Sequence, residues 1–278
     1  MTRTIAGLSE IADRYDALIC DVWGVVHNGR EAYQPACEAM ANFAGARGPV
    51  VLLSNAPRPA SAVVPQLDGF SVPRAAWQGF ITSGDATRAL LTQRAPGPAW
   101  RIGPDRDQPL FEGIDLQFAG PETAAFIACT GLVDDDLETP EDYRQSLSIA
   151  AGRELEMICA NPDRVVQRGD KLVYCAGALA DLYEGLGGKV TMAGKPYAPV
   201  YEEALAEVSR LAGRTVDRAR VLCVGDGLPT DILGANNQGL DALFVLGGIH
   251  GAELAGDAQA LLDREGLKAA WSMSELVW

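Results

Sequence analysis

The sequence predicts an α/β protein built on a doubly wound, parallel sheet with helices on both faces. Short apolar runs recur near both ends of the chain and alternate with segments of helical composition, which is the pattern of parallel strands joined by crossover helices. Several of these runs end directly in Asp, Ser or Gly. Because the carboxyl ends of the strands in an open parallel sheet border the ligand crevice, these polar residues are candidate site residues.

Five apolar segments are expected to contribute strands to this sheet: residues 16–20, 49–53, 80–82, 221–224 and 243–246. The first runs into Asp21, the second into Ser54 and the fourth, after one Gly, into Asp226. Residues 35–46 have helical composition and are expected to join the first two strands. The polar groups at the three strand ends are therefore expected on one rim of the sheet.

The middle of the chain differs from its two ends. It contains scattered Pro and Gly, and two predicted strands, at 124–131 and 154–161, lie on either side of a helical stretch. We interpret this segment as a separate α/β layer inserted into the first domain. The sequence thus predicts a first domain of residues 1–83 and 178–278 and an inserted domain of residues 84–177.

The charge balance argues against nucleic acid and membrane partners. The chain has 23 basic and 37 acidic residues, a net charge of −14, whereas nucleic acid and anionic membrane surfaces are bound by clustered Lys and Arg. No apolar run is long enough to span a bilayer, and the first residues lack the apolar stretch of a signal peptide. The six cysteines include no Cys-x-x-Cys pair and lie mostly in apolar runs, so we expect a reduced, cytoplasmic protein.

Three carboxylates form a candidate metal site. Asp21, Asp226 and Asp231 converge if the strands that precede them are neighbours. Like charges held close together raise one another's pKa unless a cation lies between them. Because the ligands are all oxygens, and because Mg²⁺ bridges carboxylates to phosphate oxygens, the expected cofactor is Mg²⁺. A turn with a helix cap is the alternative role for these aspartates.

Two further residues are suited to an anion. Lys195 is followed by a Pro placed to open a helix, and its ammonium can neutralise a phosphate as a point charge, the alternative being a surface lysine. The hydroxyl of Ser54 and the amides after it can donate to phosphate oxygens at a helix N-terminus. Acidic residues for a metal, with a lysine and a hydroxyl for an anion, predict a site for phosphoryl transfer.

Four motifs follow one another along the chain: D-x-x-G-V at 21–25, S-N at 54–55, G-K-P at 194–196 and G-D-x-x-x-x-D at 225–231. Their order resembles the haloacid dehalogenase superfamily. The segments Ile81-Thr82-Ser83 and Asn161-Pro162-Asp163, with the long insert, resemble its class IIA branch. That branch contains sugar-phosphate, nucleotide and p-nitrophenyl phosphate phosphatases, and the resemblance covers nearly the whole chain.

The resemblance implies roles for the acidic residues. Asp21 would be the nucleophile, which forms an aspartyl-phosphate. Mg²⁺ would be held by Asp21, Asp226 and the backbone carbonyl of Trp23. Asp231 would support either the waters of the metal or Lys195.

The resemblance also implies where the substrate binds. Ser54, Asn55 and Lys195 would hold the phosphoryl group, and Ser54 and Lys195 would act in catalysis. The insert would be a cap domain that selects the substrate. The implied function is a magnesium-dependent phosphatase, a phosphoric monoester hydrolase that acts on small phosphorylated metabolites through Asp21. The sequence does not identify the metabolite or fix the oligomeric state, and it leaves a homo-oligomer open.

Trp23 departs from the family pattern. The phosphatases of the family usually carry a second Asp two residues after the nucleophile, which protonates the leaving group and deprotonates water. General acid–base help is worth about 10²- to 10⁴-fold in rate. Trp23 keeps the backbone carbonyl for the metal but has no acid–base group, and its ring could fill the core or shape the pocket. We therefore expect slow turnover, a good leaving group, another acid or a different reaction.

The two histidines offer one substitute acid. His27 follows Asp21 closely enough to act in this way, although a solvated loop histidine is the alternative. His250 is expected at the surface or rim. Two histidines so far apart argue against a zinc hydrolase.

Two other functions stay open. Dehalogenase-like hydrolases carry an aromatic residue at the position of Trp23 and need no leaving-group acid, but they lack the carboxylates that this chain retains as Asp226 and Asp231. The other function is that of a binding or regulatory protein, which keeps the phosphate pocket without turnover.

Overall fold

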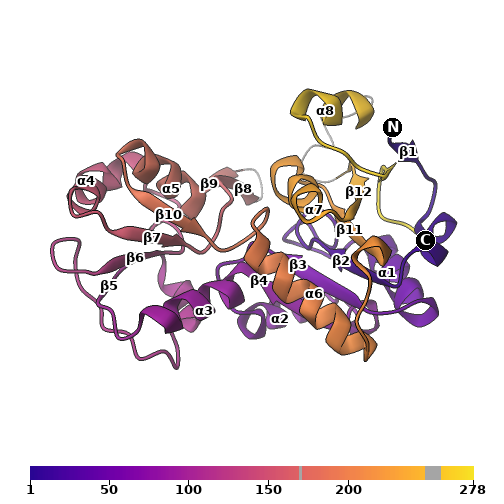
Figure 1. The fold of residues 1–278 in the computed structure, drawn as a ribbon, viewed down its shortest axis with the longest axis horizontal. Coiled ribbons are helices and arrows are strands. Elements are labelled where there is room, and N and C mark those ends of the chain that lie inside the picture. Colours follow the sequence, from indigo (N-terminus) through magenta and orange to yellow (C-terminus); the bar gives the residue numbers. More distant parts are fainter. Residues whose placement is uncertain (169–170, 248–257) are drawn as a thin grey trace. The chain divides into compact units, whose positions relative to one another are not determined.

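The computed structural model describes residues 1–168, 171–247 and 258–278, so His250 lies outside the described residues. The chain divides into two compact units, which Figure 1 shows in ribbon form. The first unit comprises Met1–Ser54, Val64–Ile81 and Lys195–Trp278, and the second comprises Asn55–Val63 and Thr82–Gly194.

The first unit is built on a seven-stranded sheet in the order β1-β13-β12-β11-β2-β3-β4. The strands are β1 (Arg3–Thr4), β2 (Ala17–Cys20), β3 (Val50–Ser54), β4 (Gly79–Thr82), β11 (Val221–Gly225), β12 (Asp241–Val245) and β13 (Trp271–Met273). From β1 to β3 every neighbouring pair is parallel. The central strands β2, β3 and β11 are buried along their whole length, as in a sheet covered on both faces. The predicted α/β fold with a parallel sheet is confirmed.

The order of the strands reverses between β2 and β11. From β2 the sheet continues through β3 and β4, whereas β11 is followed on its other side by β12 and β13. Such a reversal opens a crevice at the carboxyl ends of the two central strands, where ligands bind in open α/β sheets. Asp21 follows β2 and Asp226 follows β11, so the topology brings both carboxylates to this point.

Helices cover the sheet of the first unit. They are α1 (Gln34–Ala46), α6 (Ala198–Ala212), α7 (Leu233–Gln238) and α8 (Ala258–Glu265), with a π-helical turn η7 (Leu228–Ile232) and with α2 (Ala60–Gly69), which runs from the second unit into the first. A proline in the first turn of α6 and Gly213 after its last turn, at φ 66°, mark where this helix begins and ends.

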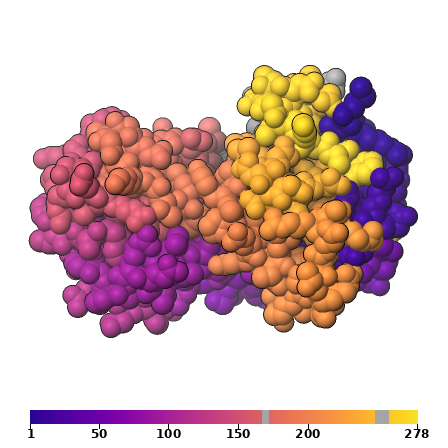
Figure 2. Space-filling view, in the orientation of Figure 1, coloured from indigo at the N-terminus to yellow at the C-terminus, as the bar shows by residue number. Residues whose placement is uncertain are grey.

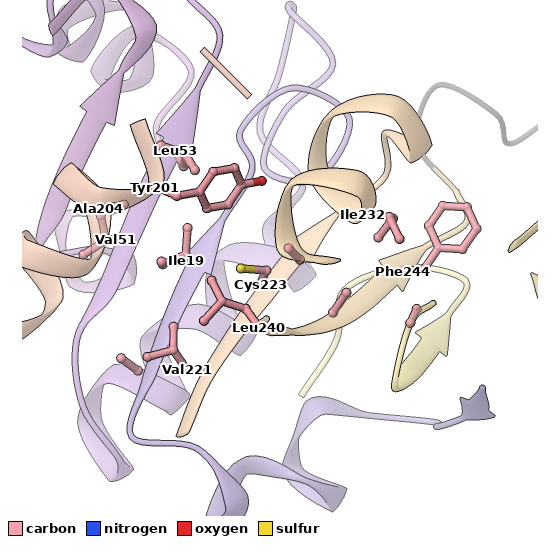
Figure 3. Packing of buried hydrophobic residues seen from close by; sticks show 14 of the residues in the cluster. Ile19, Val51, Leu53, Tyr201, Ala204, Val221, Cys223, Ile232, Leu240 and Phe244 are labelled. Carbon is pink, nitrogen blue, oxygen red and sulfur yellow. The ribbon is translucent and has the colours of Figure 1, made fainter. Parts of the chain in front are cut away.

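One face of the sheet packs against α6, η7 and α7 (Figure 3). Successive residues of a strand point to opposite faces, and Ile19, Val51 and Cys223 point to this one. They form a single buried cluster with Tyr201 of α6 and Ile232 of η7. Burial of an aliphatic side chain of this size contributes roughly 1.5–3 kcal/mol, so the cluster fixes both helical elements on the sheet.

The opposite face is packed in the same way. Leu18 and Cys20 alternate with residues of the first cluster and are fully buried without belonging to it. Helix α1 contacts β3 and buries Met40 and Phe43, so its apolar side covers a part of the sheet that α6 does not.

The two ends of the chain lie side by side in the first unit. Strand β1 pairs in parallel with β13, and the indigo and yellow surfaces adjoin in Figure 2. The indole N–H of Trp271 donates to Tyr15 Oη, which in turn donates to Asp241 Oδ2, and both distances are 2.7 Å. This chain of hydrogen bonds ties β13 and β12 to the segment before β2.

The second unit contains a parallel four-stranded sheet in the order β10-β7-β6-β5 and an antiparallel hairpin of β8 and β9. Its strands are β5 (Ala99–Ile102), β6 (Phe126–Cys129), β7 (Glu156–Cys159), β8 (Val165–Arg168), β9 (Lys171–Tyr174) and β10 (Lys189–Met192), and its helices are α3 (Ser83–Arg94), α4 (Arg144–Gly152) and α5 (Ala176–Gly185). Thr82 and Asp85 form a capping box at the start of α3.

The second unit extends further along the chain than the predicted insert. Residues 178–194 are expected in the first domain from the sequence, but they contain most of α5 and all of β10. Strand β10 pairs in parallel with β7, and this pairing keeps residues up to Gly194 in the second unit.

None of the helices in the described part of the chain is both long and apolar enough to cross a membrane. All six cysteines are buried, and they form no disulfide with one another. A thiol in such surroundings behaves as a small apolar side chain, which agrees with the expectation of reduced cysteines.

Candidate active site

Asp21 is the first residue after β2 and lies where the strand order reverses. Its backbone N–H donates to Val224 O at 2.8 Å, which extends the pairing of β2 with β11 by one residue. The residue is only 8% exposed. Burying a charged group this deeply costs free energy unless a cation or hydrogen-bond donors lie beside it.

Lys195 supplies the cation. Its Nζ donates to Asp21 Oδ1 and to Asp231 Oδ1, the second at 2.7 Å, and the residue is 3% exposed. Burial alone would lower the pKa of Lys195, but the attraction of the two carboxylates outweighs it and raises the pKa above the usual value. The predicted lysine is therefore a buried, charged residue and not a surface lysine.

Asp231 is presented by the π-helical turn η7. Its Oδ2 accepts a hydrogen bond from Gly227 N at 3.0 Å, and its Oδ1 accepts one from Lys195. Burial and the nearby charge of Asp21 raise the pKa of Asp231 to about 6, and Lys195 opposes this shift. The aspartate that ends the G-D-x-x-x-x-D motif thus holds the lysine together with Asp21.

Asp226 lies against the loop that follows β2. It is 1% exposed, and a Cβ added to Gly24 would collide with its Oδ2. Gly24 has a φ of 82°, the left-handed conformation that favours glycine. The glycine of the D-x-x-G motif therefore has a packing role, since it lets the backbone approach the second carboxylate.

The three carboxylates fit a hard divalent cation. One ligand atom from each of Asp21, Asp226 and Asp231 lies within 4.8 Å of the others. All three residues are buried, and the cluster sets three carboxyl groups beside one lysine. A donor set made only of oxygens is what Mg²⁺ and similar ions prefer.

Ser54 and Asn55 are consecutive in the chain but belong to different units. Ser54 ends β3, beside β2, and is 9% exposed. Asn55 belongs to the second unit, where its Nδ2 donates to Asp163 Oδ1 at 3.0 Å, and Asp163 N donates to Asn161 Oδ1 at the same distance. The Asn161-Pro162-Asp163 turn therefore anchors Asn55 within the second unit.

Trp23 packs back onto its own loop. A Cβ added to Gly29 would lie 2.6 Å from Cζ2 of the indole, so the ring rests directly on the glycine backbone. The ring also meets His27 edge-on, with centroids 5.7 Å apart, and His27 in turn lies 4.9 Å from the ring of Phe70.

His27 is buried, and the expectation of a solvated loop histidine is wrong. It is 2% exposed, and its Nδ1 accepts a hydrogen bond from Gly29 N at 3.0 Å. Burial lowers the pKa of His27 to about 4, so its ring is neutral near pH 7. A neutral histidine can accept a proton but is not a general acid.

Tyr201 is a residue of the site that sequence reasoning misses. Its hydroxyl lies 3.4 Å from the carbonyl oxygens of Thr230 and Asp231, and a Cβ on Gly234 would collide with its ring. The hydroxyl and ring of Tyr201 therefore pack against the π-helical turn η7 and the start of α7. Its one signal in the sequence is a polar atom within the apolar stripe of α6, which is not specific enough to single it out.

Two sequence models of protein families match this chain. One is described as haloacid dehalogenase-like hydrolase and matches residues 18–117, and the other is described as HAD-hydrolase-like and matches residues 192–264. The first match includes Asp21, and the second includes Lys195 and Asp231.

Several known proteins are similar to this chain over most of its length. A solved structure of a hydrolase of the haloacid dehalogenase-like family from Brucella suis is 44% identical, with a TM-score of 0.89 over 98% of this chain and 99% of that one. The 5′-nucleotidase YutF of Bacillus subtilis is 27% identical over 84% of this chain and 88% of its own length. The D-glycerol 3-phosphate phosphatase of Mycobacterium tuberculosis is 28% identical over 88% of this chain and 67% of its own length.

Proposed function

Because this chain belongs to the haloacid dehalogenase-like family of hydrolases, we propose that it is a phosphoric monoester hydrolase that uses Mg²⁺ to act on small phosphorylated metabolites. The observation that carries the proposal is the buried ammonium of Lys195 between Asp21 and Asp231. Asp226 brings a third carboxylate to the same point. The class IIA resemblance of the motifs is confirmed by the match of both ends of the chain to the family.

The side chains of the site supply a nucleophile and its counter-charge. A carboxylate oxygen of Asp21 would attack phosphorus, and the hydrogen bond from Lys195 orients that carboxylate. Asp231 holds Lys195 in place through its second hydrogen bond. Ser54 and Lys195 would bind the phosphoryl group. Mg²⁺, bound by Asp21, Asp226 and the carbonyl of Trp23, would neutralise charge on the phosphoryl oxygens.

The second unit would select the substrate. It has its own sheet and its own buried core, which a substrate-selecting cap requires. Asn55 is the first residue of the second unit and directly follows Ser54 of the candidate site in the chain. We assign Asn55 a part in substrate binding on this basis.

The names of the relatives agree with this activity. A 5′-nucleotidase and a D-glycerol 3-phosphate phosphatase both release phosphate from a small phosphorylated molecule, but their substrates differ. The shared chemistry therefore supports a phosphatase without identifying the metabolite.

A dehalogenase-like hydrolase is the second candidate, and Trp23 is the observation that favours it. The three clustered carboxylates count against it, because carbon–halogen cleavage by a carboxylate needs no metal site. A protein that binds phosphates without turnover is the third candidate.

The test is phosphate release from p-nitrophenyl phosphate and a panel of phosphorylated metabolites, with Mg²⁺ and with a chelator. We expect release that requires the metal and is lost in Asp226→Ala. The matched control is Asp68→Asn, an exposed carboxylate paired with Arg74, which should retain activity. Halide release from a haloacid would favour the dehalogenase, and thermal stabilisation by phosphates without turnover would favour the binding protein.

A further inference from the structure

The loop that follows Asp21 is closed by its own hydrogen bonds. Gly24 N donates to His27 O at 2.9 Å, and Tyr33 N donates to Val26 O at 2.8 Å. Bridges also pair Trp23 with His27 and His27 with Ala32. The position of Trp23, two residues after Asp21, is therefore held in a defined conformation.

The indole of Trp23 is fixed on this loop by contacts on two sides. The backbone of Gly29 lies against its Cζ2 and Cη2 atoms, where an added Cβ would be 2.6 and 3.1 Å away. The ring of His27 meets it at an angle of 71°. An aromatic ring held in this way occupies the position without offering an exchangeable acid, because an indole N–H donates hydrogen bonds but does not ionise near neutral pH.

Four other polar side chains near Asp21 are engaged in contacts of their own. Lys195 is held as a cation by two carboxylates, and Asp231 accepts hydrogen bonds from Lys195 and from Gly227. His27 is buried and uses Nδ1 to accept from a backbone amide. The Tyr201 hydroxyl lies against the backbone of η7.

We infer that this enzyme cleaves phosphates whose leaving group departs as a stable anion, namely acyl phosphates, phosphoanhydrides and aryl or enol phosphates, in preference to alkyl phosphates. This inference rests on the proposed phosphatase function. The fixed indole of Trp23 offers no acid two residues after Asp21, and among the described residues the side chains of Lys195, Asp231, His27 and Tyr201 are engaged in the contacts given above instead of being placed to protonate an alkoxide.

The reaction balances without an acid from the protein. An oxygen of Asp21 forms a bond to phosphorus, and the bond from phosphorus to the leaving oxygen breaks with its electron pair on that oxygen. The leaving group departs as an anion. Water then attacks phosphorus of the aspartyl-phosphate, which regenerates the carboxylate and releases phosphate, and the proton of the water passes to solvent. General acid help, worth about 10²- to 10⁴-fold, is missing from the first step.

The experiment is a leaving-group series on the purified full chain with Mg²⁺. It compares acetyl phosphate, aryl phosphates of graded phenol acidity and glycerol phosphate by kcat/KM, which reports the steps through departure of the leaving group. We expect kcat/KM to fall steeply as the leaving group becomes more basic. Trp23→Asp, which places a carboxyl on the same loop, should flatten this dependence and raise the rate for glycerol phosphate most. Trp23→Phe, an aromatic control without an acid, should keep the steep dependence.

Two results would overturn the inference. The first is equal kcat/KM for alkyl and aryl phosphates in the wild type, which would show that a proton donor is present. The wild-type series decides the question even where Trp23→Asp does not fold. No phosphate release from any substrate would overturn the proposed function itself, together with the inference that rests on it.

Discussion

Lys195 is held in the first unit by charge, and its burial is tolerated because two carboxylates surround it. Removing one partner of a buried ion pair costs about 3–5 kcal/mol, because the remaining charge is left without compensation. Asp21 and Asp231 would face each other directly without the lysine. The residues of the site are therefore coupled, and changes at one of them act on the ionisation of the others.

The buried imidazole of His27 predicts a dependence of stability on pH. Its pKa falls from 6.5 to about 4 on folding because burial disfavours the charged ring. The unfolded chain therefore takes up a proton below about pH 6.5 that the folded chain does not bind until about pH 4. This histidine should lower the free energy of unfolding by up to about 3 kcal/mol as the pH falls through that window.

The comparison of the wild type with His27→Asn isolates this effect, since Asn has an oxygen to accept from Gly29 N and does not titrate. Denaturant unfolding at pH 4 and at pH 7 should show a smaller loss of stability in the variant. An equal loss in both proteins would mean that the ring of His27 is protonated in the folded state.

At the scale of single residues, the sequence predicts the charged residues of the candidate site but not the burial of the residues around them. Asp21, Asp226, Asp231 and Lys195 are recognisable because each stands in a short motif or at the end of an apolar strand. The burial of His27 is not predictable in the same way. It depends on a contact with Phe70, more than forty residues along the chain, which no local pattern encodes.

Among the elements, the loop after β2 links Asp21, the proposed nucleophile, to Asp226 of the proposed metal site. Gly24 lies in this loop with a φ of 82°, and the carboxylate of Asp226 fills the space that a side chain would need. We predict that Gly24→Ala weakens the response of the melting temperature to Mg²⁺ and destabilises the protein by at least about 1–2 kcal/mol, the cost of the left-handed conformation alone.

The matched control for this glycine is Gly45→Ala in α1, where an added Cβ meets no atom within 4 Å. Alanine in a helix is favoured over glycine by roughly 0.5–1 kcal/mol, so this variant should be slightly more stable and should keep the metal response. Thermal melts of both variants with and without Mg²⁺ provide the measurement. Gly24→Ala that behaves like Gly45→Ala would show that the loop tolerates a side chain beside Asp226.

The strands of the fold were predictable to different degrees. β2, β3 and β11 are apolar throughout and are buried on both faces, so their sequences alone indicate a parallel sheet. β10 contains Lys189 and Thr191, is only partly buried, and carries no such signal. The π-helical conformation of η7 is likewise not indicated by the sequence, and neither is the packing of Tyr201 against Gly234 just after it.

The molecule as a whole is two units that share one chain, and the location of their boundary follows from strand pairing. The sequence predicts an insert, but it places the return to the first domain at residue 178, before β10. The chain returns at Lys195, directly after Gly194, because β10 must first pair with β7. The composition of a short, partly polar strand such as β10 does not indicate which of the two sheets it joins.

For the whole protein, bound metal should appear as thermal stability. We predict that Mg²⁺ raises the melting temperature of the wild type, because a cation relieves the repulsion among three buried carboxylates. Each kcal/mol gained corresponds to about 2–4 °C in a protein of this size. Asp226→Ala should abolish the shift, and a variant that retained the full shift would place the metal elsewhere.

The central claim is that Asp21 carries the phosphoryl group during turnover. The most direct measurement is an acid-quenched single turnover of an aryl phosphate, followed by mass spectrometry of the protein. We predict a phosphorylated peptide containing Asp21 in the wild type and none in Asp21→Asn, which should keep its fold and lose phosphate release. Phosphate on a different residue, or normal turnover by folded Asp21→Asn, would contradict the account.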